Sequence, residues 1–204
     1  EQMQKQEGQD RNRVEVLTHQ AELIKRLIDT YEDYPSGVRF LATNKEIGFS
    51  SYGPLANIIQ VQPNYRSAIS ASLGEAATYL VVEDASAAFN GIGLLKEERR
   101  GVVTFAPRNE IKWRVNHRPA VSDLGVIGYA DELVSHDESF QDLIYAVLGH
   151  FLVVQDLQTA NRIYNQVKSH QVNVVTLAGE VLGHSGFIRG GTNHRNQSDF
   201  VGRQ

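Results

Sequence analysis

The middle of this chain reads twice, and that duplication limits the folds it can adopt. Residues 53–74 match residues 128–149 at a constant shift of 75. After a three-residue deletion the shift becomes 72, and the match continues from Tyr79 onto Phe151 and from Asp84 onto Asp156. So many coincidences at two constant shifts indicate two homologous subdomains, which is a short tandem rather than a solenoid.

Each copy has the same order of predicted elements. Apolar residues at helical spacing predict a helix that ends at Gly74 or Gly149. A buried strand should follow, and then a helix capped by Asp84 or Asp156 and running to about Arg99 or His170. The expected strands are Tyr79–Val82 and Val102–Phe105 in the first copy and Phe151–Val154 and Val172–Leu177 in the second, with Val102–Thr104 matching Val174–Thr176. Strand, helix and strand in about thirty residues form a βαβ unit, so we expect a mixed α/β fold with a parallel strand pair in each subdomain.

The amino-terminal segment has the pattern of a coiled-coil arm. Its apolar residues step by four, three, four and three positions, which places them on one stripe of a helix: Leu17, Ala21, Ile24, Ile28 and Tyr31. Two heptads are equally compatible with an ordinary amphipathic helix docked on the domain. Residues 34–37, Tyr-Pro-Ser-Gly, predict a turn that ends this helix. The first residue is Glu1, which indicates a piece of a longer protein.

The segment between the two copies is basic and alternates in polarity. Ile111, Trp113 and Val115 alternate with Lys112 and Arg114, which favours a half-buried strand. The alternative places Trp113 outward between two cations, as a stacking platform for single-stranded nucleic acid.

Composition and charge exclude several classes of protein. The chain has no cysteine, which excludes a disulfide scaffold and a thiolate metal site. Its net charge is -4, so it is not a polycation built for DNA, although residues 96–118 are locally basic and residues 123–142 hold only acidic charges. No apolar run approaches the ~18 residues that span a membrane.

The candidate catalytic motifs are incomplete. Residues 183–187 resemble a nucleophile elbow, but Phe187 stands where the second glycine should be. Gly190-Gly191-Thr192 lacks the lysine of a phosphate loop, and the histidines show no metal-ligand spacing on one helix. We therefore expect neither enzyme activity nor a cofactor in this chain.

Two motifs resemble the hinge domain of structural maintenance of chromosomes (SMC) proteins. Residues 53–56, Gly-Pro-Leu-Ala, lead into an amphipathic helix and then residues 80–84, Leu-Val-Val-Glu-Asp, and residues 174–180 lead to Gly186 and then Gly190-Gly191-Thr192. The resemblance, together with the duplication, implies five segments: an arm (residues 1–34), hinge subdomain one (45–107), a linker (108–124), hinge subdomain two (125–195) and the start of a returning arm (196–204).

The resemblance also implies a function. SMC hinges pair two chains, and here the expected interface residues are Ser185, Gly186, Ile188, Gly190 and Gly191, with Gly48 and Gly53 as weaker candidates on the opposing edge. A glycine-bearing strand lets a second backbone approach along an exposed edge. Weak, sequence-independent DNA contact is expected from Lys96, Arg99, Arg100, Arg108, Lys112 and Arg114. The resemblance places ATP, magnesium and kleisin-type subunits at head domains outside this chain and implies a cytoplasmic protein on the nucleoid. The compact linker and the absence of long insertions favour a prokaryotic protein, and prokaryotic SMC proteins pair with an identical chain.

Two other functions remain open at this point. One is a nucleic-acid-binding module whose dimerisation is incidental. The other is a small-molecule enzyme built on the same sheet. Charge reversal at Lys112 and Arg114 separates the first from a hinge, and a ligand-dependent rise in melting temperature would reveal the second.

Overall fold

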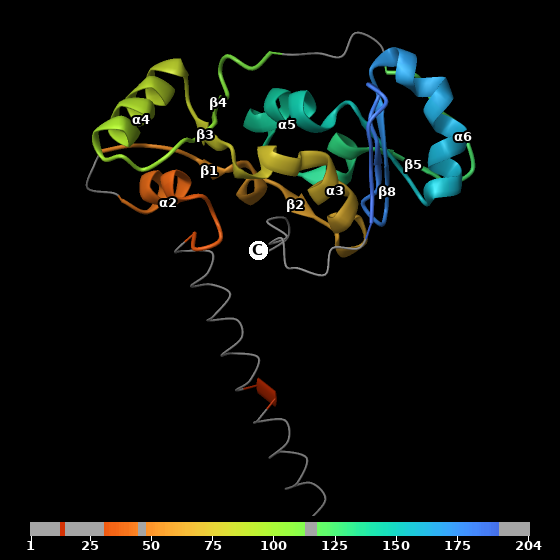
Figure 1. Cartoon of the computed structure of the whole chain (residues 1–204), viewed down its shortest axis with the longest axis horizontal. Coiled ribbons are helices and arrows are strands. Elements are labelled where there is room, and N and C mark those ends of the chain that lie inside the picture. The colour runs from red at the N-terminus through yellow and green to blue at the C-terminus, as the bar shows by residue number, and fades with distance from the viewer. Residues whose placement is uncertain (1–12, 15–30, 45–47, 113–117, 192–204) are drawn as a thin grey trace, which may run out of the picture.

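The computed structural model describes residues 13–14, 31–44, 48–112 and 118–191, which form helices and strands in two halves (Figure 1). The helices are α2 (Ser36–Thr43), α3 (Arg66–Leu73), α4 (Ala85–Glu97), α5 (Gln141–Leu148) and α6 (Leu157–Val167). The strands are β1 (Gly53–Pro54), β2 (Gln60–Val61), β3 (Leu80–Val82), β4 (Phe105–Pro107), β5 (Val126–Tyr129), β6 (Val134–Ser135), β7 (Phe151–Val154), β8 (Asn173–Thr176), β9 (Val181–Leu182) and β10 (Ile188–Arg189). The expected mixed α/β fold class is confirmed.

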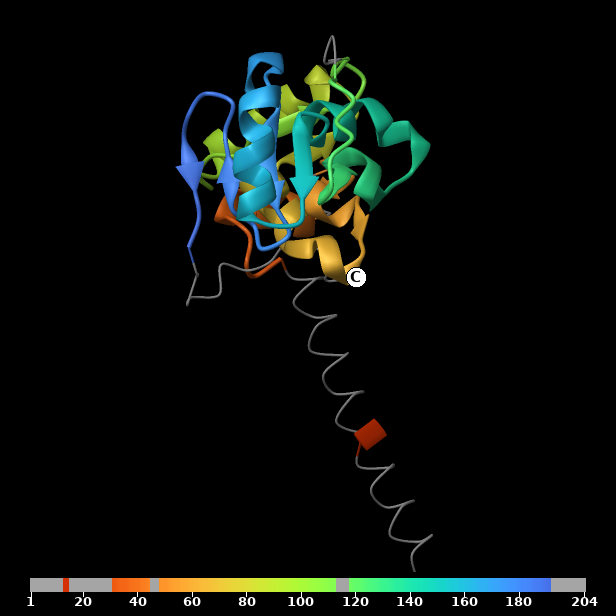
Figure 2. The same ribbon diagram turned by 90° about the vertical axis from the view of Figure 1, so that its right-hand side faces the viewer.

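Each half contains the predicted βαβ unit. In the first half the strand order is β1-β3-β4, and β3 runs parallel to β4 with α4 as the crossover. In the second half the order is β10-β9-β8-β7-β5, and β7 runs parallel to β8 with α6 as the crossover. Figure 2 shows α6 lying across the outer face of this second sheet. We call these halves the first and the second repeat.

The pairing registers show that the two repeats are equivalent. Gly53 in β1 lies opposite Val81 in β3, and Gly128 in β5 lies opposite Val153 in β7. These pairs are related by the same shifts of 75 and 72 that relate the sequences. Gly53 and Gly128 both have a positive φ, which favours glycine at the equivalent position of each repeat.

A pseudo-two-fold relation joins the repeats at their centre. β2 pairs with β6 in antiparallel register, and Gln60 lies opposite Ser135, its own equivalent at a shift of 75. α3 contacts α5 across the same axis, and their equivalent residues Ile69 and Ile144 are both fully buried in one core. The two copies therefore share a hydrophobic core, as expected for small units that cannot bury enough apolar surface alone.

The helix starts follow from the sequence. The side chain of Asp84 accepts a hydrogen bond from the backbone N–H of Ala87, and Asp156 accepts one from Thr159, at 2.9 and 2.8 Å. Both aspartates cap the crossover helices as predicted. At the other end of α3, Gly74 has φ +52, which explains why a glycine ends that helix.

The position of β4 corrects the sequence alignment of the second strands. Leu80 pairs with Phe105, and the equivalent Leu152 pairs with Val174. Phe105–Pro107, rather than the expected Val102–Thr104, therefore matches Val174–Thr176. The chain makes a longer turn after α4, with positive φ at Arg99 and Gly101, and this turn leaves Val102 exposed outside the sheet. Apolar character alone placed this strand three residues too early.

The predicted turn at residues 34–37 is wrong, and other predicted segments lie partly or wholly outside the described residues. Pro35 precedes α2, so Ser36 and Gly37 begin a helix instead of completing a turn. Ile111 and Lys112 are not in a strand, and residues 113–117, which include Trp113 and Arg114, lie outside the described residues. Most of the expected arm segments, 1–34 and 196–204, also lie outside them.

Candidate dimerisation edges and charged surface

The second sheet ends in β10, whose outer edge has no paired strand within the described ranges. Residues 185–191 are all exposed, and Phe187 and Ile188 keep 81% and 71% of their surface accessible. The carbonyl of Phe187 accepts a hydrogen bond from the N–H of Gly183 on the β9 side. Since pairing alternates along an antiparallel strand, the N–H and C=O of Ile188 face away from β9. This edge has the free backbone groups and exposed apolar side chains of a pairing surface.

Of the glycines near β10, only Gly190 lacks a backbone reason to be glycine. Gly186 has φ +96 and forms the turn before β10, and Gly191 has φ +119, so the backbone accounts for both positions. A Cβ added at Gly190 would meet only the flexible side chain of Glu180, at 3.0 Å, and one at Gly191 would meet nothing within 4 Å. Ser185 is exposed at the same turn. Intrachain packing therefore leaves room for larger residues beside β10.

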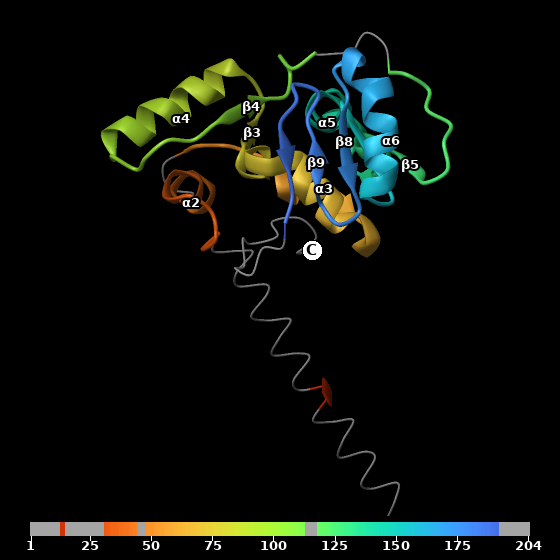
Figure 3. The same cartoon turned by 45° about the vertical axis from the view of Figure 1, so that its right-hand side comes forward.

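The first sheet has an open edge of its own at β4. β8, the equivalent of β4, is covered on its outer edge by β9, with Val174 opposite Leu182 and Val175 opposite Val181. β4 has no such neighbour among the described residues (Figure 3). Gly53 lies in β1, on the opposite side of this sheet, and is buried, whereas Gly48 is exposed and lies outside the sheet.

In the structure, the described members of the six predicted DNA-contact residues lie in two groups, at opposite ends of α4. Lys96, Arg99 and Arg100 are exposed at the carboxyl end of α4. Arg108 and Lys112 lie near the other end, where Glu110 accepts a hydrogen bond from the N–H of Ala85. The thirteen residues of α4 separate the two groups by about 20 Å. Arg114 lies outside the described residues, so at most three of the six form one compact group.

Arg108 is held by contacts that its sequence position did not reveal. Its guanidinium donates two hydrogen bonds to Glu83, at 3.0 and 3.1 Å. It also lies 4.9 Å from the ring centroid of Tyr52 and 5.6 Å from that of Phe140, which belongs to the second repeat. Arg108 therefore connects the two repeats. Together with Lys112 and Asp142 it lines a polar cleft of about 430 Å³.

These contacts make Glu83 unusually acidic. Hydrogen bonds from Arg108, Tyr52 and Asn109 lower the pKa of Glu83 from 4.5 to about 2. Because the pKa is lower in the folded chain, the stabilisation is complete above pH 4.5 and is lost as the pH falls toward 2. We expect the variant Glu83→Gln to lose less stability than the parent between pH 4.5 and pH 2. Urea unfolding at each pH measures this slope.

The matched control is Glu97→Gln, which removes an exposed carboxylate at the end of α4 without removing an Arg108 contact. It should retain the acid sensitivity of the parent. Equal slopes for Glu83→Gln and the parent would show that the Arg108 contacts do not stabilise the carboxylate of Glu83.

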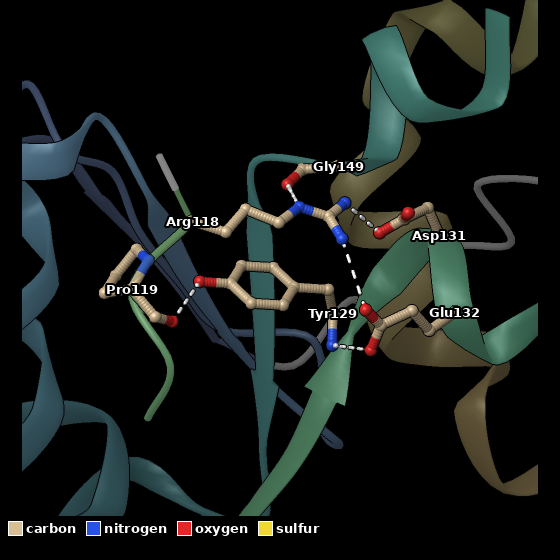
Figure 4. Close-up of polar contacts among 6 residues, drawn as sticks. All are labelled: Arg118, Pro119, Tyr129, Asp131, Glu132 and Gly149. Carbon is tan, nitrogen blue, oxygen red and sulfur yellow. Dashed lines mark hydrogen bonds and ion pairs between the residues drawn. The ribbon is translucent and has the colours of Figure 1, made fainter. Parts of the chain in front are cut away.

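A second arginine, Arg118, anchors the linker to the second repeat (Figure 4). Its guanidinium pairs with the buried carboxylate of Asp131, donates to Glu132 at 3.2 Å and donates to the carbonyl of Gly149 at 2.9 Å. It lies 4.3 Å from the ring centroid of Tyr129 and 4.4 Å from that of Tyr145.

Gly149 permits the close approach of Arg118, since an added Cβ would lie 2.7 Å from the guanidinium. Tyr129 adds a further tie, because its hydroxyl donates to the carbonyl of Pro119 at 2.9 Å. In the sequence, Arg118 appears only as one cation of a basic segment. The adjacent acidic residues at 131 and 132 were the one sequence feature that could have suggested its partners.

In the incomplete nucleophile-elbow motif the His184 ring contacts an amide. Its Nδ1 lies 2.9 Å from the amide oxygen of Asn173. In the part of the chain that the structure describes, no three histidine or acidic side chains gather as a candidate metal site. None of the described helices combines the length and hydropathy needed to cross a membrane.

Comparison with known proteins agrees with this architecture. Residues 49–164, more than half of the chain, match the family described as SMC proteins Flexible Hinge Domain. The chain belongs to the SMC hinge family. The hinge is 30% identical over 186 residues to the chromosome partition protein Smc of Desulfitobacterium hafniense, a match that covers 88% of this chain and 15% of that protein.

Solved hinge structures have the same fold. An asymmetric dimer of the Geobacillus stearothermophilus SMC hinge domain matches with a TM-score of 0.81 at 27% identity, over 94% of this chain and 79% of that one. The Pyrococcus furiosus SMC hinge domain matches with a TM-score of 0.64 at 30% identity, over 84% and 88%. The predicted family and its two-subdomain hinge fold are therefore confirmed.

Proposed function

We propose that this chain is the dimerisation hinge of a chromosome-partitioning SMC protein, and that it pairs with an identical chain. The observation that carries this proposal is the pair of open sheet edges, β10 in the second repeat and β4 in the first. In the second repeat the edge of β8 is covered by β9, which supports pairing at the equivalent edge of β4. We propose that β10 of a second chain occupies the equivalent place beside β4.

Two-fold symmetry makes this arrangement efficient. An isologous dimer forms each contact twice, so β10 of each chain meets β4 of the other and every favourable contact is doubled. The two sheets would then continue across the interface, and four open edges would disappear. We propose that Gly190 and Gly191 let the second backbone approach closely, because a Cβ added at either would meet little or nothing of its own chain among the described residues. Gly53 is buried in β1, so its position does not support a direct contact.

The first experiment is the solution mass of the hinge by light scattering after size exclusion, over a range of concentrations. The proposal expects a mass near twice 22.8 kDa that persists on dilution. A mass of 22.8 kDa at every concentration would refute pairing between identical chains. Mixing with a related hinge chain would then test heterodimerisation.

The longer protein would supply the remaining functions. The relatives named as chromosome partition proteins are far longer than this chain, which covers 15% of the Desulfitobacterium protein. We propose that head domains outside this chain bind ATP and magnesium and recruit kleisin-type subunits. The hinge would act in the cytoplasm at the nucleoid, as a connector without catalytic activity of its own.

DNA contact is a second role, which we assign to Lys96, Arg99 and Arg100. These three cations are exposed and adjacent at one end of α4, whereas Arg108 is engaged with Glu83. We expect the triple reversal to glutamate to reduce DNA binding by at least tenfold and to lower the salt dependence by about one unit per lost phosphate contact. Fluorescence anisotropy at several salt concentrations measures both.

The matched variant for that experiment is Arg108→Gln, which should leave the salt dependence of DNA binding unchanged. The dimer should also persist in the triple variant. Binding that is insensitive to salt would contradict contact through phosphates, and simultaneous loss of the dimer would favour a nucleic-acid module with incidental dimerisation.

A further inference from the structure

Helix α4 carries an apolar surface that is exposed among the residues the structure describes. Phe89 keeps 71% of its surface accessible and Ile92 keeps 37%, and the two side chains lie one turn apart on the helix. We call Phe89 and Ile92 the α4 ridge. Apolar side chains gathered on one side of a covering helix indicate a surface that binds a partner.

In the second repeat, a strand lies beside the side of the crossover helix that is equivalent to this ridge. Ile92 is the eighth residue after the capping Asp84, and Tyr164 is the eighth after Asp156, so the two occupy equivalent helix positions. The hydroxyl of Tyr164 donates to the carbonyl of Gly183 at the end of β9, at 2.9 Å. This side of the crossover helix therefore overlies the strand that flanks β8. Among the described residues no equivalent strand lies beside β4, which explains why Ile92 is exposed.

Ile188 lies on the face of the second sheet that corresponds to the ridge side of the first. It lies opposite Leu182, so both side chains are on the same face of the sheet. Leu182 is buried in a cluster with Ala160, Ile163 and Val167 of α6. Ile188 is therefore on the helix-covered face of its sheet, yet it extends beyond α6 and remains exposed. Its side chain is placed to be covered by a helix of another molecule.

Gly93 adds an independent indication. A glycine inside a helix costs about 1 kcal/mol relative to alanine. The neighbouring Gly91 is required, because an added Cβ would lie 2.7 Å from the ring of Phe105. At Gly93 an added Cβ would meet nothing within 4 Å. Packing among the described residues does not explain this glycine, and a position without a side chain next to Phe89 leaves space for a second molecule.

We propose that the α4 ridge receives Ile188 of a second copy of this chain. The proposal rests on the proposed dimerisation through β10 and β4, and adds a side-chain contact to the backbone pairing. With Ile188 opposite Phe105, whose ring packs beneath α4 against Gly91, the incoming side chain lies on the α4 side of the joined sheet. Contact with Phe89 and Ile92 would then cover all three apolar groups.

Cross-linking tests this contact directly, because the chain has no cysteine of its own. The double variant Ile92→Cys/Ile188→Cys should give a covalent dimer on mild oxidation. Because a disulfide requires Cα atoms within about 7 Å, such a cross-link shows that the two positions lie side by side in the dimer. The control pair Leu124→Cys/Ile188→Cys places one thiol on an exposed leucine outside both edges and should remain monomeric on a denaturing gel.

The second test measures the dimer dissociation constant by dilution. Phe89→Ala and Ile188→Ala should each weaken the dimer at least tenfold, and the double variant should weaken it by less than the product because both remove one contact. Leu124→Ala should stay within about twofold. A dimer that is unaffected by Phe89→Ala and gives no Ile92–Ile188 cross-link would overturn the ridge contact while leaving the edge pairing intact. A parent hinge that is monomeric at all concentrations would overturn both.

Discussion

Replacing Ile188 with proline is expected to weaken the hinge dimer by at least about a thousandfold. The N–H of Ile188 faces away from β9, so proline removes a donor from the outer edge without removing a hydrogen bond of the hairpin. Proline would leave an acceptor on the partner strand without its donor, which costs about 2 kcal/mol, and two-fold symmetry applies that cost twice. Sedimentation or light scattering over a concentration series measures the dissociation constant.

Two further substitutions at this position separate backbone from side-chain effects. Ile188→Val keeps the N–H and a β-branched side chain, and should leave the dimer within about threefold of the parent. Ile188→Ala keeps the N–H but removes apolar contact, and should lie between the valine and proline variants. An Ile188→Pro chain that dimerises as tightly as Ile188→Ala would show that β10 does not pair through its outer edge.

Replacing Arg118 with methionine is expected to lower the free energy of unfolding by about 3 to 5 kcal/mol. The carboxylate of Asp131 keeps only 6% of its side-chain surface accessible, and Arg118 is its cationic partner. Removing one member of a buried pair leaves an uncompensated charge in a poorly solvated site. Methionine retains much of the apolar stem that packs between Tyr129 and Tyr145, so the loss reports mainly the charge.

Arg162→Met is the matched control for that measurement. Arg162 pairs with Asp123 at 2.7 Å, but its side chain is about half exposed, so its loss should cost no more than about 1 kcal/mol. Urea unfolding should be measured in the Ile188→Pro background, where dimer dissociation adds nothing to the transition. A cost at Arg118 as small as at Arg162 would show that the linker is not held by this cluster.

Local patterns were sufficient to predict the repeated units. The caps at Asp84 and Asp156, the crossover helices and the parallel strand pairs follow from residues that are close in the sequence. Helix periodicity, capping and short apolar runs depend on local geometry, and the duplication supplied each pattern twice. The helix that begins at Ser36 was missed because Pro35-Ser36-Gly37 has turn composition, while Val38 and Leu41 gain their stability by packing against Leu80 and Leu95 of another segment.

The roles of the charged residues could not be predicted in the same way. Arg108 and Arg118 read alike within one basic segment, yet each is held by acidic groups and aromatic rings elsewhere in the fold. Glu83 precedes Arg108 by 25 residues, and no local pattern relates the two. An arginine can be assigned to DNA or to an ion pair only when the folded chain shows whether an acidic partner lies within reach.

Two copies of one βαβ unit and the glycines near the last strand can be read from the amino-acid order alone. That β9 covers β8, while among the described residues no strand covers the equivalent β4 and β10 ends the other sheet, emerges only from the assembled fold. The physical reason is that strand composition records burial and pairing potential, whereas the neighbour of a strand depends on how distant segments assemble. A strand with the same local pattern is internal in one repeat and exposed at an edge in the other.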